Sequence, residues 1–414
     1  MFGKGVKIKK ENMSLKFTAL EVGSGDAFLL EDENRKILFD SGGSKNKIVA
    51  LLRKKGITKI DLAICSHNDK DHSKGFLGLL NSKIRIGEIW LPGTWASVIH
   101  SVTHLMRHSH IIGCRNGCCW YDEFLDCLSH FEINEGCYKF HHEESLAYEE
   151  YIPNNQLIED MSFINTVLDI DCIDYCRYCK NKDHELSKFR CSKDMKFREC
   201  FRENIRKGMF HIGEHATKLM IQLDTIISIT EAAYKNGVNI RWFEPTDACT
   251  KKRVDTNIIV LNGSELTKAI STRRIDSFHM LMFALTLTME NKYSLAMEYL
   301  HDEIPVVRFS ADSDSTCQSE IPYRNNIIIT APHHGSDANA NVYRTIKGND
   351  IIWVRSDALY RTQGRPCLAF KSMNKKYCLA CKHRKPVRRE ICFEYDNNTK
   401  QWLYKIGISC ICKP

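Results

Sequence analysis

Apolar and polar positions alternate along the first part of the chain in the way that short β-strands do. Residues 15–22 are apolar at every second position, and residues 27–30 and 35–39 supply two more short runs. The Gly-Ser-Gly-Asp stretch at residues 23–26 has turn composition. Because a period of two places alternate side chains on one face of a sheet, this part predicts a β-meander ending at residues 40–43.

The pattern then changes to a helical period. Ile48, Leu51 and Leu52 share one side of a helix expected over residues 45–55, and Gly56 follows as a stop signal. A buried-type apolar strand, a second helix and a further strand are then expected at residues 60–65, 73–80 and 86–91. A β-α-β order after a meander predicts an α/β fold in which helices cover sheets.

Strand patterns return after residue 256. They lie at residues 258–261, 280–288, 294–299, 306–310, 326–331 and 351–355, with a helix near 339–346 and a final hairpin of 391–395 and 401–406. The intervening residues 93–256 hold 11 of the 19 cysteines and 10 of the 17 histidines, and their periodicity is mostly helical. We therefore expect a mainly helical Cys/His-rich insertion there.

Composition narrows the class of protein. The 414 residues are 43% hydrophobic and 27% charged, an ordinary globular balance that excludes wholesale disorder and fibrous repeats. The net charge of +8 suits an anionic partner. No apolar run approaches the length of a membrane span, and no apolar segment follows the basic first ten residues. We expect a cytoplasmic protein without a membrane segment, whose cysteines are thiols or metal ligands rather than disulfides.

The strongest chemical signal is the run His67-Asn68-Asp69-Lys70-Asp71-His72, directly after an expected strand. Side chains at i and i+2 of an extended stretch point the same way, so His67 and Asp69 can share one cation. A turn at Asp71 and His72 can direct that pair to a second one. Imidazole and carboxylate without thiolate suit zinc or manganese. The alternative is a polar loop that only caps a helix.

Two further places complete such a site. Asp312 ends an apolar strand, and His333 and His334 end another, followed by Gly335 and Ser336. Each is weak alone, because Asp and His are common at strand ends. All three groups fall at strand ends of one apparent sheet system, so we expect them to meet.

Five separated motifs occur in one order along the chain: Gly23-Ser24-Gly25-Asp26-Ala27, Leu38-Phe39-Asp40-Ser41-Gly42-Gly43, Ser66 through His72, Ser310-Ala311-Asp312 and Pro332-His333-His334-Gly335-Ser336. Together they resemble the metallo-β-lactamase superfamily and, within it, the hydrolase domain of ComEC-type DNA-uptake competence proteins. The resemblance implies an αββα sandwich with metals at one edge of two packed sheets. It also suggests two halves of that domain at residues 14–92 and 257–370, the insertion at 93–256, and a basic Cys-rich tail with a hairpin at 371–414.

The chain departs from the family pattern at several positions. Asp69 stands where most of the superfamily has His, as in the ComEC-like branch, and Ala311 stands where a Gly is usual. Gly364-Arg365-Pro366 replaces a Gly-His-Pro, which exchanges a histidine for a guanidinium that can bind phosphate. We find no histidine for the family's third motif. Competence proteins are also embedded in the membrane, and this chain is not expected to be.

The resemblance implies a role for each site residue. His67 and Asp69 would hold one metal, Asp71 and His72 the other, and Asp312 would bridge them. His334 would be a further metal ligand, and His333 would contact the substrate oxyanion or protonate the leaving group, although the reverse assignment is nearly as good. Asp71, Asp312 and His333 are thus the expected catalytic residues. Two cations would lower the pKa of a shared water. Asp26 and Asp40 would brace the ligand loops, and Arg365 and Ser336 would bind substrate.

Basic stretches favour a phosphodiester substrate. Residues 371–389 hold eight Lys or Arg and no acidic residue, and residues 180–207 hold ten against five acidic residues, with Phe189, Phe197 and Phe201 between them. Such stretches are also found as solvated faces. The first hypothesis is a phosphodiesterase or nuclease acting on nucleic acid or a nucleotide, in DNA processing or antiviral defence. The alternatives are a hydrolase of a small ester, thioester or lactam, and a non-catalytic scaffold for the insertion, which could bind a partner protein.

The cysteines suggest further metal sites. Cys378, Cys381, Cys410 and Cys412 could hold a structural zinc in the tail. Within the insertion, the same is possible for Cys172, Cys176, Cys179, His184 and Cys191. Cys114, Cys118 and Cys119 fit buried thiols better. His100, His104 and His108 share a helical face, where ligand roles are uncommon.

Overall fold

The fold is known from a computed structural model. It describes residues 15–99, 102, 150–152, 214–245, 250–266, 269–271, 294–313, 326–346, 350–357, 365–379, 390–406, 410 and 412. Most of the insertion expected at 93–256 and the strand expected at 280–288 lie outside the described residues. Among the described helices, none combines the length and the apolar character needed to cross a bilayer.

A nine-stranded sheet forms one half of the molecule. Its central strands β3, β4, β5 and β7 run parallel, and its other neighbours pair antiparallel. In spatial order the strands are β10 (Gly263–Glu265), β7 (Asn239–Pro245), β5 (Arg85–Pro92), β4 (Lys59–Ile64), β3 (Lys36–Phe39), β2 (Phe28–Glu31), β1 (Lys16–Ala19), β17 (Ile391–Asp396) and β18 (Gln401–Ile406). The expected meander and the tail hairpin thus belong to one sheet.

A seven-stranded sheet forms the other half. Its order is β16 (Lys376–Cys378), β15 (Ile352–Arg355), β14 (Ile328–Thr330), β13 (Ile304–Phe309), β12 (Met297–His301), β9 (Ile258–Val260) and β8 (Lys252–Arg253). The strands from β13 to β16 are parallel. A separate pair, β6 (Glu150–Ile152) and β11 (Ala269–Ser271), is antiparallel.

The two large sheets pack face to face. Along β3 and β4 the side chains alternate: Ile37, Phe39 and Leu62 join the core between the sheets, whereas Leu38 and Ala63 face the opposite way. Phe39 stacks on Phe309 of β13 with ring centroids 4.6 Å apart. This alternation explains how a sheet whose strands are largely apolar can be buried on both faces.

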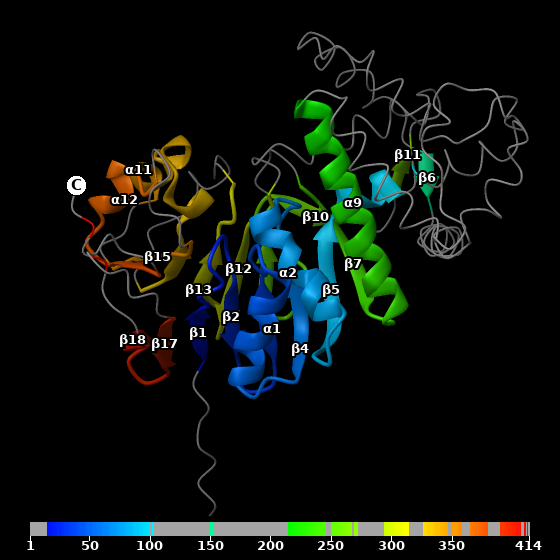
Figure 1. Cartoon of the computed structure of the whole chain (residues 1–414). Helices are drawn as coiled ribbons and strands as arrows, with labels where there is room; N and C mark the ends of the chain where they lie inside the picture. The colour runs from blue at the N-terminus through cyan, green and yellow to red at the C-terminus, as the bar shows by residue number, and fades with distance from the viewer. Residues whose placement is uncertain are drawn as a thin grey trace, which may run out of the picture.

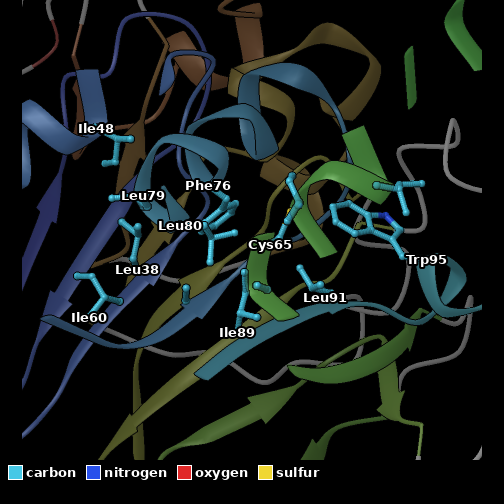
Figure 2. Packing of buried hydrophobic residues seen from close by; sticks show 14 of the residues in the cluster. Leu38, Ile48, Ile60, Cys65, Phe76, Leu79, Leu80, Ile89, Leu91 and Trp95 are labelled. Atoms are coloured by element: carbon cyan, nitrogen blue, oxygen red, sulfur yellow. The ribbon is translucent and has the colours of Figure 1, made fainter. Parts of the chain in front are cut away.

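Helices cover the outer face of the nine-stranded sheet. These are α1 (Lys45–Lys54), α2 (Lys70–Leu80) and α9 (Glu214–Lys235), which lie over its blue to green strands (Figure 1). Leu38 and Ile60 from the sheet lie close to Phe76 and Leu79 from α2 in the core beneath (Figure 2).

Shorter helices cover the seven-stranded sheet. They are α11 (Val342–Thr345) and α12 (Leu368–Lys371), near β15 and well apart from α1 and α2 (Figure 1), preceded by the 3₁₀ turns η4 (Pro332–Gly335) and η5 (Asp337–Asn339). Tyr343 and Phe370 pack there against Trp353 of β15. The layers therefore follow the order helix, sheet, sheet, helix, and the mixed α/β sandwich expected of a metallo-β-lactamase-like fold is confirmed.

Two details differ from the sequence expectations. The second helix begins at Lys70 rather than at residue 73, so Asp71 and His72 lie in its first turn and not in a preceding turn. Within the range expected to be an insertion, α9 covers the nine-stranded sheet and β7 extends it by pairing with β5. The sandwich thus reaches into the 93–256 range; the domain boundaries otherwise stay a prediction.

Candidate metal centre

Three chain segments meet at one edge of the sandwich. His67 and Asp69 follow β4 and lead into α2, Asp312 follows β13, and His333 and His334 follow β14. Because β13 and β14 are parallel neighbours, their carboxyl ends reach the same edge. The structure therefore brings the three sequence motifs together.

Asp312 lies at the centre of the cluster and is 2% exposed. Its Oδ1 is 3.2 Å from His72 Nε2 and 3.9 Å from His334 Nε2, whereas its Oδ2 is 3.4 Å from His333 Nε2 and 3.7 Å from His67 Nε2. One carboxylate thus faces two separate groups of imidazole nitrogens, one with each oxygen.

Donors on the Oδ1 side form a tight group. His334 Nε2 lies 3.2 Å from Asp71 Oδ2 and 3.1 Å from His72 Nε2. On the Oδ2 side, His67 Nε2 lies 3.7 Å from Asp69 Oδ2. Asp69 is the N-cap residue of α2, yet its side chain makes no capping hydrogen bond. The alternative of a loop that only caps a helix is therefore poorly supported.

The other ring nitrogen of each buried histidine is held by an oxygen. His334 Nδ1 is 2.9 Å from Asp26 Oδ1, and His72 Nδ1 is 2.8 Å from Asp40 Oδ2. Asp40 also accepts hydrogen bonds of 2.8 Å from the Ser66 amide and hydroxyl, and the Ser66 oxygen lies 2.9 Å from His67 Nδ1. When these Nδ1 atoms carry the protons, every Nε2 presents a lone pair to the centre.

That tautomer makes the cluster suitable for cations. The Nε2 atoms of His72 and His334, 3.1 Å apart, would then repel each other unless a positive charge lies beside them. His67 Nε2 is buried and has no hydrogen-bond partner among the described residues. Buried nitrogens of this kind are normally satisfied by a hydrogen bond, a water or a bound ion. The donors, imidazole and carboxylate without thiolate, are of the type that binds zinc or manganese.

The electrostatics agree with a cation site. Burial lowers the pKa of His72, but Asp312 and Asp40 outweigh it and hold that pKa well above the usual value. For His334, Asp26 and Asp71 likewise outweigh burial and raise the pKa to about 10. Burial raises the pKa of Asp312, but the surrounding imidazoles hold it well below its usual range. The carboxylates thus create a negative potential that favours any positive charge placed among them.

His333 differs from its neighbour His334. Its side chain is 20% exposed against 1% for His334, and burial together with the Arg365 guanidinium lowers its pKa despite the opposing effect of Asp312. Arg365 Nη2 lies in hydrogen-bond contact with His333 Nε2. The half-buried pair of His333 and Arg365 therefore forms the accessible side of the cluster.

Backbone strain accompanies the C-terminal donors. Ala311, His333 and His334 all have positive φ, at 47°, 47° and 54°. The His333 amide donates to the Ala311 carbonyl over 2.9 Å, which ties the ends of β13 and β14 together. Residues in this left-handed region are strained unless they are glycine, and such strain is common at functional sites.

Gly25 explains the glycine-rich motif before β2. Its φ is +87°, and a Cβ there would lie 1.6 Å from the Asp71 carbonyl oxygen. The adjacent Asp26 amide donates to that same carbonyl over 3.2 Å. Only glycine lets this loop approach α2 closely enough for Asp26 to reach His334.

Ser336 is not brought into the cluster. Its hydroxyl accepts a hydrogen bond of 3.3 Å from the Ala338 amide and caps η5. Its expected substrate-binding role therefore stays a prediction. Arg365, by contrast, lies against His333, where that role is sterically reasonable.

Sequence reasoning missed Arg355. This buried residue at the end of β15 donates from Nε to the His334 carbonyl over 2.6 Å and from Nη2 to Asp357 over 3.3 Å. It supports the backbone of the His334 loop. The signal was an arginine at the end of an otherwise apolar strand, which is unusual unless it is paired.

The remaining sequence candidates divide into described and undescribed residues. Cys378, Cys410 and Cys412 form a cluster at β16, whereas Cys381 lies outside the described residues. Four further groups also lie outside the described residues: the expected site around Cys172, the residues near Cys114, the histidines from His100 to His108, and the basic residues 180–207.

One comparison with known families gives a result. A model of the metallo-beta-lactamase superfamily matches residues 20–84, which contain Asp26, Asp40 and the motif from His67 to His72. No curated protein matches the chain. Together, the matched segment and the convergent His/Asp cluster support a metal-dependent hydrolase, with donors positioned to bind metal.

Proposed function

We propose that this metal-dependent hydrolase is a phosphodiesterase of the nuclease type that uses two divalent cations, zinc in the first instance. The observation that carries the proposal is Arg365, whose guanidinium lies against His333 on the accessible side of the cluster. A guanidinium offers a fork of donors that matches the oxygens of a phosphate. An uncharged carbonyl substrate has no comparable need for it.

The donors divide naturally between two cations. His67, Asp69 and Asp312 Oδ2 would hold one, and Asp71, His72, His334 and Asp312 Oδ1 would hold the other. Two cations in such a site lower the pKa of a water and polarise the group under attack. The hydrogen bonds that Asp26 and Asp40 accept from His334 and His72 fix the imidazole orientations on which this division depends.

His333 and Arg365 would act on the substrate. The low pKa of His333 keeps its imidazole neutral near pH 7, so it can hold a proton at one nitrogen and accept one at the other. Arg365 would bind a non-bridging phosphate oxygen and orient the phosphodiester. The net charge of +8 and the lysines near β16 favour an approaching polyanion.

The finer resemblance to ComEC-type hydrolase domains supports DNA as the polymer. The resemblance rests on Asp69, which stands where most of the superfamily has a histidine. A role in DNA processing or in antiviral defence follows from that resemblance alone and is part of this proposal, as is the cytoplasmic location expected from the sequence.

The test is a parallel screen of phosphodiesters and carbonyl compounds with purified full-length protein. Phosphodiesters would be single- and double-stranded DNA, RNA, a cyclic dinucleotide and bis(p-nitrophenyl) phosphate; carbonyl compounds would be a nitrophenyl ester, a thioester and a β-lactam. We expect chelator-sensitive cleavage of a phosphodiester. Turnover of the carbonyl compounds without phosphodiester cleavage would replace the proposal with the small-molecule hydrolase.

Arg365→Gln sharpens the test. We expect kcat/KM for the phosphodiester to fall about 10- to 100-fold, because a charged hydrogen bond to the substrate is lost. Arg344→Gln, an exposed residue of α11, makes the same change in net charge and should have no effect. Equal losses in the two variants would show that overall charge, and not Arg365, attracts the substrate.

A further inference from the structure

A second cluster of metal-type donors lies away from the His/Asp centre. The Sγ atoms of Cys378, Cys410 and Cys412 all lie within 4.8 Å of one another. Cys378 ends β16, the edge strand of the seven-stranded sheet, whereas Cys410 and Cys412 come from the C-terminal segment that follows β18. Residues 32 and 34 positions apart are therefore brought to one point.

The backbone holds these thiols in place. The Cys410 amide donates to the Lys376 carbonyl over 3.0 Å, so Cys410 lies beside β16. The Cys412 amide donates to Cys410 Sγ over 3.4 Å. A sulfur that accepts a backbone N–H is stabilised in its thiolate form, the form that binds metal.

The sulfurs are not bonded directly to each other. Cys378 Sγ and Cys410 Sγ are 3.2 Å apart, whereas a disulfide bond is about 2.05 Å long. Thiolates around one zinc, each about 2.3 Å from it, stand about 3.8 Å apart in a tetrahedron. Small side-chain rotations would convert the observed spacing into that geometry.

The surroundings suit a structural ion and not a reactive thiol. Cys378 and Cys410 are 6% and 7% exposed and pack with Tyr343, Trp353 and Phe370 in the thin core beneath α11 and α12. We propose that Cys378, Cys410 and Cys412 bind a structural soft divalent cation, zinc first, which fastens the C-terminal segment to the edge of the seven-stranded sheet.

The primary experiment counts metal in the full-length protein. Wild type, the Cys378→Ser/Cys410→Ser variant and a Cys392→Ser control, a buried cysteine of β17, would be purified from zinc-supplemented cultures and measured by elemental analysis. We expect the double variant to lose about one zinc per chain and the control to lose none. Equal zinc content in all three would overturn the proposal.

A second measurement needs no variant and remains informative if the double variant fails to fold. Wild-type protein is alkylated with and without a chelator, and the modified cysteines are mapped by mass spectrometry. Cys378, Cys410 and Cys412 should be protected until the chelator is added, whereas Cys392 should respond equally in both samples. Protection that chelation leaves unchanged, or recovery of Cys378 and Cys410 as a disulfide-linked peptide, would contradict the site.

The proposal is separable from the catalytic one. Asp71→Asn with His72→Ala should remove zinc from the His/Asp centre and leave the chelator-dependent protection of the three cysteines intact. If those substitutions abolished the protection as well, the thiol cluster would have no cation of its own.

Discussion

The two outer helical layers of the sandwich differ greatly in helix length and in the size of the core beneath them. The nine-stranded sheet is covered by α1, α2 and α9, of 10, 11 and 22 residues, over a large core. The described cover of the seven-stranded sheet consists of α11 and α12, of 4 residues each, and two 3₁₀ turns over a small core. A thin layer buries little apolar area and gains most from an added cross-link. The thiol cluster lies in that thin layer.

The donors of the candidate metal centre differ in the same way. Asp71 and His72 sit in the first turn of a long, well-packed helix, whereas His333 and His334 sit in a short strained turn held by Arg355 and by the Ala311 carbonyl. One half presents its ligands by regular structure and the other by a tied loop. Asp312 faces donors from both halves. We therefore expect substitutions in the α2 half and in the loop half to differ in their effects on stability and activity.

Asp312→Asn should have the largest effect. The amide keeps the shape but removes the negative charge that faces both groups of imidazoles, so one oxygen no longer attracts a cation. We expect activity to fall by about 10³-fold or more, because two-metal stabilisation is worth several kcal/mol. Hydrolysis rates and metal content would be measured together.

A nearby carboxylate serves as the control. Asp337→Asn changes an exposed residue of η5 and should leave both quantities unchanged. Full activity in Asp312→Asn with both metals retained would remove Asp312 from the centre of the mechanism.

Gly25→Ala tests the half of the cluster in which α2 presents Asp71 and His72. The new Cβ would meet the Asp71 carbonyl at 1.6 Å and would require a positive φ, so we expect a loss of more than about 3 kcal/mol in the free energy of unfolding. Gly56→Ala is a matched control, since Gly56 has φ +71° but nothing within 4 Å of its Cβ position. It should cost only about 1 kcal/mol. Similar losses in a denaturant titration would show that the approach to Asp71 is unimportant.

Several features of the site were predictable because they depend on local pattern. The His67–His72 motif, Asp312 and the His333/His334 pair each follow an apolar run, and the ends of the parallel neighbours β13 and β14 meet. These runs did not show that β4, which belongs to the other sheet, ends at the same edge. The start of α2 was not predictable in this way. Its first turn faces the His/Asp cluster, so His72 and Ser73 are buried although polar, and the apolar helical period begins only after them.

Long-range pairings were also hidden from the sequence. β17 pairs with β1 across more than 370 residues, with Lys16 opposite Glu394, and β7 lies beside β5 although 146 residues separate Pro92 from Asn239. No local period records which strands become neighbours. The strained turns at Ala311, His333 and His334 were missed for a related reason: tertiary contacts hold these residues at positive φ against their own preference.

Asp40→Asn should have an intermediate effect. Asp40 orients His72 directly and His67 through Ser66, so the change disturbs ligands of both proposed cations without removing one. Outer hydrogen-bond partners of metal ligands contribute about 10- to 100-fold in affinity or activity, and we expect a loss in that range. Zinc affinity would be measured by competition with a chromophoric chelator.

Asp61→Asn provides the comparison for that experiment. This partly exposed residue of β4 accepts a hydrogen bond from the Lys36 amide and lies outside the cluster. The zinc affinity of the Asp61→Asn variant should therefore match that of wild type. If Asp40→Asn also bound zinc normally, the hydrogen bonds to His72 and Ser66 would be structural only.

Ala311→Gly, in the strained loops that carry Asp312, His333 and His334, should have the smallest effect. Unlike Gly25→Ala, it should not lower the free energy of unfolding. Ala311 is held at φ 47°, where a Cβ costs about 1–2 kcal/mol, and glycine loses about 0.5–1 kcal/mol through its greater freedom in the unfolded chain. The free energy of unfolding should therefore stay equal or rise by up to about 1 kcal/mol, with metal content unchanged. Ala331→Gly, at a buried residue with φ −68°, has no strain to relieve and should destabilise. Equal destabilisation of both variants in a denaturant titration would mean that the turn before Asp312 carries no strain. The loops after β13 and β14 would then position their donors without more backbone strain than α2 does.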